Sequence, residues 1–216
     1  MKVPKNFYQV TVDQYQRILP IYQKIEKETD TEVILTDWCR VISILTNTRP
    51  DQIESLPIDQ LKVIIKSLNW LVNGSITSSK RKYLLIKGKL YKAKVNAKEF
   101  NVAQYVEIKT FLGRGNWVNE MHRILASIYS PLTIKGFKHD GIGHEKRAEI
   151  FKQISVGRVY PTVFFYSIQF QNLIKNIQEY GIRRAEEMNM KAEEDLMLIL
   201  RETLENIGGG IVPSTK

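Results

Sequence analysis

Hydrophobic residues recur every three or four positions in the first part of the chain, beginning directly after Thr11. Thr11 is a good N-cap, and the apolar stripe that follows predicts a helix running from Val12 to the polar stretch KIEKETD. Pro20 lies inside this stretch, so we expect it to bend the helix or to end it early.

Three further helices are predicted before residue 75. Residues 31–45 carry a broad apolar face that includes Trp38, and this helix is expected to stop before Pro50, because the residue before a proline is pushed out of the helical region. A short helix then begins near Pro50. The stretch IDQLKVIIKSLNWLV (58–72) predicts another helix, which ends at Asn73-Gly74.

The apolar pattern changes to a period of two in KYLLIKGKLYKAKVNA, which follows the turn-rich stretch GSITSSKRK. Apolar residues at positions 91, 93 and 95 alternate with Lys92 and Lys94, and Lys87-Gly88 is suited to a tight turn. The sequence therefore predicts a β-hairpin with a strongly basic outer face.

Helical spacing returns after Asn101, a second N-cap, and a further helix is expected over residues 117–129, ended by Pro131. A glycine-rich loop, TIKGFKHDGIGH, leads to a helix near residues 145–154. Pro161 is expected to open a strongly apolar helix that Gly181 interrupts. Residues 183–207 predict a final amphipathic helix, followed by GGGIVPSTK as a flexible or partner-ordered tail.

One phrase occurs twice, as VTVDQYQRI near the start and as FNVAQYVEI near the middle. Both copies hold Val, Gln, Tyr and Ile at matching spacings, and each opens a helical stretch that a proline later stops. Chance coincidence of two capped helices is one reading, and two related half-modules is the other, which we favour.

The predicted fold is mainly α, with two related helical half-modules flanking a basic β-hairpin and with a long C-terminal helix and flexible tail. The expected divisions are a first half-module over 1–76, the hairpin over 77–98, a second half-module over 99–180, and the C-terminal helix and tail over 181–216. Such a scaffold offers two similar docking faces in one subunit, which suits a symmetric assembly.

Composition adds limits to this outline. Hydrophobic residues make up 43% of the chain and charged residues 25%, as in globular proteins. The single Cys39 excludes an internal disulfide and a multi-cysteine metal cage. The start, MKVPKNFYQV, has no apolar signal region, and no stretch approaches the roughly 20 apolar residues of a membrane span. We expect no membrane contact.

The sequence matches no common enzyme motif. His139 and His144 have no standard zinc spacing, and Cys39 beside Trp38 is expected to be a buried, inert thiol. FLGRGNW lacks the context of a phosphate-binding loop, and no GxSxG or HExxH occurs. We therefore predict no catalytic residue, no metal site, no cofactor and no small-molecule substrate, and we expect that the chain is not an enzyme.

The net charge of +9 is concentrated in one short segment, which carries eight basic residues and no acidic one. This segment is the candidate interaction site, for a neighbouring subunit or for DNA. Edge lysines also protect strands from aggregation, and no recognised DNA-binding motif accompanies the charge, so we favour edge protection or subunit contact over nucleic acid. The eight residues are Lys80, Arg81, Lys82, Lys87, Lys89, Lys92, Lys94 and Lys98.

The order of segments resembles that of small helical virion proteins of tailed phages. VTVDQYQRI, ISILTNTRPDQIESLPIDQL, the basic GKLYKAKVN hairpin, FNVAQYVEIKTFL and HRILASIYSP are together similar to tail or neck ring proteins of short-tailed, crAss-like phages, over residues 5 to 180. The resemblance implies a non-enzymatic, homo-oligomeric ring subunit of the virion, assembled in the host cytoplasm. It would join portal and tail proteins and surround the packaged DNA at its exit channel.

Two other functions are open at this point. One is a phage tail assembly chaperone, which would be absent from the finished particle. The other is a nucleic-acid-binding regulatory protein, whose binding would weaken steeply with salt and would need no other virion protein.

Overall fold

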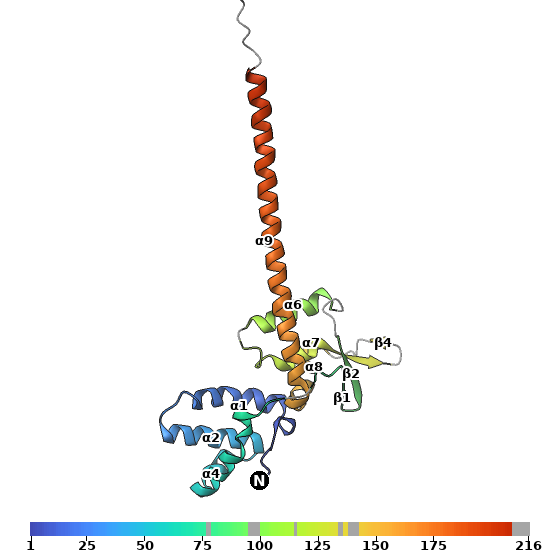
Figure 1. Ribbon diagram of the computed structural model, residues 1–216. Helices are drawn as coiled ribbons and strands as arrows, with labels where there is room; N and C mark the ends of the chain where they lie inside the picture. Colours follow the sequence, from blue (N-terminus) through green and yellow to red (C-terminus); the bar gives the residue numbers. More distant parts are fainter. Residues whose placement is uncertain (77–78, 95–99, 115, 134–135, 138–142, 209–216) are drawn as a thin grey trace, which may run out of the picture. The chain divides into compact units, whose positions relative to one another are not determined.

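The structure is a computed structural model that describes residues 1–76, 79–94, 100–114, 116–133, 136–137 and 143–208 (Figure 1). It is mainly helical, with a small antiparallel sheet and a long C-terminal helix, which confirms the predicted fold class. The chain divides into two compact units, Met1–Ser167 (unit 1) and Ile168–Lys216 (unit 2).

The N-terminal helices of unit 1 agree closely with the sequence pattern. Pro20 lies inside the first long helix and does not end it. The single helix predicted over residues 58–72 is wrong, because the chain leaves the helical conformation at Leu68, which is fully buried. The break lets the indole N–H of Trp70 donate to the Pro4 carbonyl at 3.1 Å. The elements are η1 (Phe7–Gln9), α1 (Val12–Ile25), α2 (Thr31–Thr46), α3 (Pro50–Glu54), α4 (Ile58–Ser67) and α5 (Trp70–Asn73).

The predicted hairpin forms, with β1 (Tyr83–Ile86) and β2 (Lys89–Ala93) antiparallel. Lys87 and Gly88 have φ values of 47° and 76°, as both central residues of a type I′ turn require. Two more strands, β3 (Tyr129–Thr133) and β4 (Gly136–Phe137), extend the sheet in the order β1-β2-β3-β4. The sequence pattern did not predict β3. The preceding helix, which was expected to end ahead of Pro131, ends at Ile128, and the chain continues directly as a strand that pairs with β2.

The second helical stretch begins as predicted, but its later boundaries differ. The helix expected from residue 117 starts at Met121, because Trp117–Glu120 form turns. The last helix begins at Val156, ahead of Pro161, and Gly181 does not interrupt it. The elements are α6 (Val102–Gly113), α7 (Met121–Ile128), α8 (His144–Lys152) and α9 (Val156–Gly208).

One part of the core of unit 1 lies where α8 meets β2 and β3. The ring of Phe151 packs against the rings of Tyr91 and Tyr129, with centroids 5.6 and 5.7 Å apart. The start of the chain is joined to this region by two backbone hydrogen bonds, from Val12 to the Ile154 carbonyl and from Val156 back to Val10 (both 2.8 Å). These contacts fix α1 beside the beginning of α9.

The first copy of the repeated phrase forms a capping box at the start of α1. The Thr11 hydroxyl accepts from the backbone N–H of Gln14 at 3.2 Å, and the Gln14 side-chain oxygen accepts from the Thr11 N–H at 3.1 Å. The Gln14 amide nitrogen then donates to the carbonyls of Ile44 and Leu45, at 3.0 and 3.3 Å, in the last turn of α2. We call this combination of a capping box and a bond to the next helix a glutamine clasp.

The second copy forms the same clasp between α6 and α7. The Asn101 side chain accepts from the Gln104 backbone N–H at 2.8 Å, and the Gln104 side-chain oxygen accepts from the Asn101 N–H at 3.4 Å. The Gln104 amide nitrogen donates to the carbonyl of Ser127, in the last turn of α7, at 3.1 Å. Each copy of the phrase therefore forms a helix cap and a hydrogen bond to the helix that follows.

Candidate functional site: the basic hairpin and a polar network

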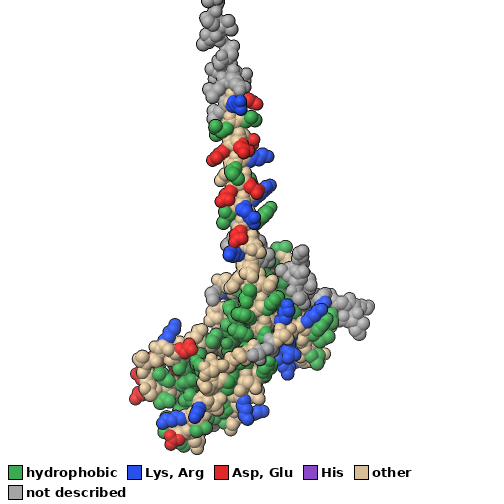
Figure 2. All heavy atoms as spheres, in the orientation of Figure 1, with side chains coloured by type: hydrophobic (Ala, Val, Ile, Leu, Met, Phe, Trp, Pro, Cys, Tyr) green, Lys and Arg blue, Asp and Glu red, His purple; other side chains and the backbone are tan. Residues whose placement is uncertain are grey.

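The basic residues predicted as an interaction site separate into groups with different surroundings. Lys80, Arg81, Lys82, Lys87 and Lys89 are exposed, whereas Lys92 and Lys94 are half-buried and Lys98 lies outside the described residues. Figure 2 shows Lys and Arg side chains beside hydrophobic ones over the part of the surface where β1 and β2 lie.

The segment ahead of β1 is fastened to α9 within unit 1. The ammonium of Lys80 lies 3.8 Å from the centroid of the Phe165 ring, a cation–π contact. The backbone N–H of Arg81 donates to the Thr162 hydroxyl at 3.0 Å, and the Arg81 carbonyl accepts from the phenol of Tyr129. Burial raises the pKa of Tyr129 to about 12, so the phenol stays protonated and keeps donating at neutral pH. The backbone here is held in place while the arginine side chain is exposed.

Lys94 takes a different direction from the other basic residues. Its ammonium donates to the side-chain oxygen of Gln104, the residue that forms the second clasp, and lies 5.9 Å from the centroid of the Phe100 ring. Lys94 is thus built into the structure between the sheet and α6 and is not displayed with the hairpin lysines.

The exposed face of the hairpin is apolar at its centre. Leu85 and Leu90 are directly opposite in register, as are Tyr83 and Lys92. Tyr83, Leu85 and Leu90 are all exposed, Leu85 to 70%. We call these four residues the hairpin face. The strongly basic outer face expected from the sequence is therefore corrected to an apolar strip with lysines around it, because the alternation puts Leu84 and Ile86 inward and Leu85 outward.

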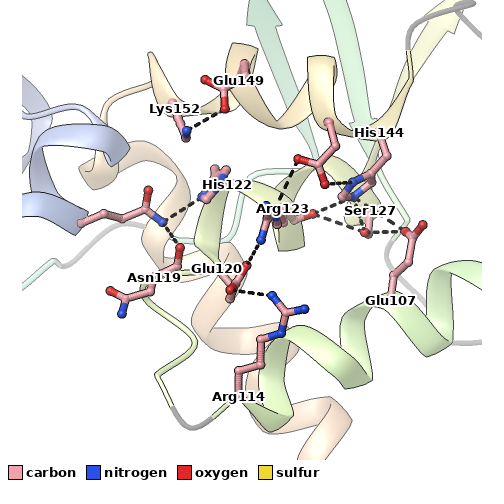
Figure 3. Close-up of polar contacts among 12 residues, drawn as sticks. Glu107, Arg114, Asn119, Glu120, His122, Arg123, Ser127, His144, Glu149 and Lys152 are labelled. Carbon is pink, nitrogen blue, oxygen red and sulfur yellow. Dashed lines mark hydrogen bonds and ion pairs between the residues drawn. The ribbon is translucent and has the colours of Figure 1, made fainter.

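A second polar cluster links α6, α7 and α8 around Arg123 (Figure 3). The Ser127 hydroxyl donates to a Glu107 carboxylate oxygen at 3.0 Å and lies 2.9 Å from Nε2 of His144. His144 Nδ1 lies 3.9 Å from a Glu145 carboxylate oxygen. Serine, histidine and glutamate thus come together in the order that nucleophilic catalysis uses.

The geometry of this cluster does not suit a nucleophile. Nε2 of His144 also lies 3.2 Å from the Arg123 carbonyl, which only accepts, so Nε2 carries the proton and cannot take one from the Ser127 hydroxyl. Ser127 is 1% exposed, and a substrate cannot reach its oxygen. The cluster instead ties the C-terminal part of α7 to its neighbours.

Glu120 anchors the other end of this network. Its two carboxylate oxygens accept from Arg114 and Arg123, each at 3.0 Å. Burial alone would raise the pKa of Glu120, but the hydrogen bonds from the two guanidinium groups outweigh it and lower the pKa below its usual value. Glu120 precedes α7, so these ion pairs fix the turn that leads into the helix.

Gln16 of α1 contacts the turn that precedes α7. Its amide nitrogen lies 2.7 Å from the carbonyls of Val118 and Asn119 and 3.0 Å from Nδ1 of His122. Burial, with the nearby cations of Lys152 and Arg123, lowers the pKa of His122, so the ring is neutral near pH 7 and Nδ1 can accept.

The structure also bears on metal binding and on the reactivity of the Cys39 thiol. Among the described residues no three His, Cys, Asp or Glu side chains are placed to hold a metal ion, and His139 lies outside those residues. Cys39 is a free, buried thiol, as predicted, and burial raises its pKa, which disfavours the reactive thiolate.

Sequence reasoning predicted the basic hairpin but missed the network around Arg123. The residues of that network come from three helices and meet only in the folded chain, so no local spacing indicates them. The repeated Gln was visible in the sequence, and its spacing of three from Thr11 and Asn101 is the capping-box signal that identifies its role.

Comparisons with known proteins give no relative. No family model matches the chain, and no similar curated protein and no similar solved structure were found. Within the described part of the chain, no helix combines the length and the apolar character needed to cross a bilayer.

Proposed function

We propose that the chain is a structural subunit of a phage tail or neck ring, which joins the portal to the tail machinery around the DNA exit channel. The observation that carries this proposal is the exposure of large apolar side chains in both units of the chain. Contiguous apolar surface is costly in water and usually marks an interaction site.

The two exposed regions differ in chemistry, which suits a subunit with unlike neighbours. In unit 1 the hairpin face has three hydrophobic residues beside Lys92, and the exposed Lys82, Lys87 and Lys89 lie close to it in the sequence, so it fits an acidic neighbour with an apolar centre. In unit 2 the helix exposes methionine, leucine and isoleucine side chains between acidic and basic ones. A ring subunit needs more than one interface, and head-to-tail contacts between copies close a ring.

Nucleic-acid binding is a second candidate, favoured by the concentration of eight basic residues between positions 80 and 98. Five of them are exposed and available to phosphate groups. The exposed leucines of the hairpin face are the reason to prefer a protein neighbour, because phosphate contacts make no use of them.

The first test is mass spectrometry of purified mature particles of the phage that encodes the chain. We expect the polypeptide in the particle at about one or two copies per portal chain, the ratio of a ring that matches the portal. An assembly chaperone would be abundant in infected cells and absent from the particle, and that result would overturn the proposal.

A matched pair of variants tests the role of the hairpin face in the same particles. Leu85→Asp places a charge in the apolar strip, and Val63→Asp places one on α4, at a residue that is equally exposed (70% and 68%). We expect Leu85→Asp to reduce incorporation at least about tenfold while Val63→Asp is incorporated normally. Salt-sensitive DNA binding that survives Leu85→Asp, with normal incorporation, would favour the nucleic-acid alternative.

A further inference from the structure

Unit 2 contains an apolar pattern with a repeat of eleven residues. Gly181 and Ala192 are eleven apart, as are Ala185 and Leu196, and Met188 and Ile199. The steps between successive members are four, three, four, four and three residues. Every residue from 179 to 199 is exposed on α9, so the described chain does not cover this pattern.

An eleven-residue repeat holds its members on one face of a helix. Eleven residues make three full turns at 3.67 residues per turn, which is close to the 3.6 of an α-helix. The pattern therefore follows the helix axis with little drift, as in helices that associate along their length. The sequence continues the same pattern on both sides, with Ile at 174 and 177, Thr at 203 and Ile at 207. We give the name α9 stripe to six residues: Gly181, Ala185, Met188, Ala192, Leu196 and Ile199.

Gly181 is a second sign that something approaches this face. A glycine inside a helix costs about 1 kcal/mol relative to alanine. A Cβ atom added to Gly181 would meet nothing within 4 Å, so no contact in the described chain requires a glycine there. A glycine at the start of the α9 stripe, followed by Ala192 one repeat later, allows two helix backbones to come close.

Charge along the helix indicates how two copies would align. Residues 175–184 contain three basic side chains and one acidic one, whereas residues 186–195 contain five acidic side chains and one basic one. Parallel copies in register would place like charges side by side. A displacement of one repeat superposes the apolar residues again and brings the basic segment of one copy beside the acidic segment of the next.

We infer that the α9 stripe binds the stripe of a second copy of this chain, with the two helices parallel and displaced by one eleven-residue repeat. The displacement corresponds to about 16 Å along the helix. Such a contact is heterologous, because the same residues of the two copies occupy different places in it. The contact between two copies does not rest on the proposed function, because the apolar pattern and the charges of α9 support it by themselves.

A pair of lysine variants of the full chain tests whether the stripe is the contact. Met188→Lys changes the stripe, and Met190→Lys is its control, because Met190 is equally exposed (58% against 64%) but lies 200° around the helix. We expect the wild type to form oligomers in sedimentation experiments, Met188→Lys to associate about a hundredfold more weakly, and Met190→Lys to behave as wild type. A monomeric wild type, or equal effects of the two variants, overturns the inference.

Disulfide cross-linking tests the displacement. Residues 181 and 192 of one helix are about 16 Å apart and cannot bridge to each other, whereas in displaced copies Gly181 lies beside Ala192 of the neighbour. The stripe occupies one face of α9 and contacts one neighbour, so we expect Gly181→Cys with Ala192→Cys to give dimers linked by one disulfide, and each single variant to give none. The buried Cys39 of the wild type provides the background control. Cross-linking of a single variant, dimers joined by two disulfides, or no cross-link at all overturns the parallel, displaced arrangement.

The two proposals fail in different ways. Oligomers held by the α9 stripe, from a chain that is absent from particles, would overturn the proposed function and leave this inference standing. The opposite result is a chain that is present in particles but monomeric at high concentration in solution, with Met188→Lys incorporated normally. That result would overturn the contact through the α9 stripe and leave the proposed function standing.

Discussion

The two glutamine clasps have the same local chemistry and different surroundings. In each clasp, a capping residue and a glutamine three positions later exchange hydrogen bonds between side chain and backbone N–H. The amide nitrogen of the glutamine also donates to a carbonyl in the last turn of the next helix. The valine that opens each helix is the clearest difference, since Val12 is 0% exposed and Val102 is 80% exposed. The repeated phrase therefore specifies a joint between two helices and not a repeated core.

The second clasp also has a charged neighbour that the first lacks. Lys94 donates to the side-chain oxygen of Gln104, whereas Gln14 uses its amide nitrogen on two carbonyls of α2. The glutamine of the first clasp thus binds two carbonyls, whereas the glutamine of the second clasp binds one carbonyl and an ammonium. Substitutions at matched positions should separate what the phrase does locally from what each setting adds.

The largest effect is expected from aspartate at the two valines. Val12→Asp buries a carboxylate without a partner, so we expect a loss of at least about 3 kcal/mol in the free energy of unfolding. Val102→Asp leaves the carboxylate in water in the first turn of α6, where a negative charge is favourable, so its effect should be within about 0.5 kcal/mol of zero. Urea denaturation of both variants measures the difference, and similar losses would show that the burial of the two valines does not differ in solution.

Glutamate at the two clasps should give the next largest effect. Gln14→Glu turns a donor into a carboxylate that faces the carbonyls of Ile44 and Leu45, and we expect a loss of about 2–3 kcal/mol. Gln104→Glu faces the Ser127 carbonyl in the same way, but the Lys94 ammonium offsets part of the cost, so the loss should be about 1 kcal/mol smaller.

The control for the clasp comparison is removal of the ammonium. In a Lys94→Met background, Gln104→Glu should become as costly as Gln14→Glu, because the partner that distinguishes the two sites is gone. Unfolding free energies of the single and double variants form the cycle. An unchanged cost of Gln104→Glu in that background would mean that Lys94 does not stabilise the clasp.

Local signals predicted the joints and the turn well. Thr11 and Asn101 were identified as caps from residue type and the stripe that follows, and Lys87-Gly88 from the change of period. These features depend on residues a few positions apart, so the sequence contains what is needed to predict them.

Features that depend on distant partners were not predicted. Residues far apart in the sequence pair in β2 and β3, since Tyr91 lies opposite Pro131, 40 positions later. The chain leaves the helical conformation at Leu68, which is fully buried in the folded chain. For the candidate site, the eight basic residues could be named, but Lys94 contacts Gln104 apart from the others, and the leucines that the hairpin exposes were not predicted. The helix also continues through Gly181, because a single glycine costs too little to end it.

The smallest effect concerns His122, where the two half-modules meet through Gln16. Burial lowers the pKa of His122 below the ordinary value of 6.5, so the unfolded chain takes up this proton at a higher pH than the folded chain does. Between the two pKa values the unfolded state binds more protons, and the free energy of unfolding must fall as the pH drops below about 6.5.

His122→Asn keeps an acceptor for Gln16 and removes the titration. Between pH 7.5 and pH 5.5 the wild type should therefore lose on the order of 1 kcal/mol more than His122→Asn, as measured by urea denaturation, and parallel pH profiles would show that His122 is protonated equally in both states. Because the two proteins differ only at residue 122, a difference between their pH profiles assigns this pH sensitivity to His122, the residue that Gln16 of α1 contacts.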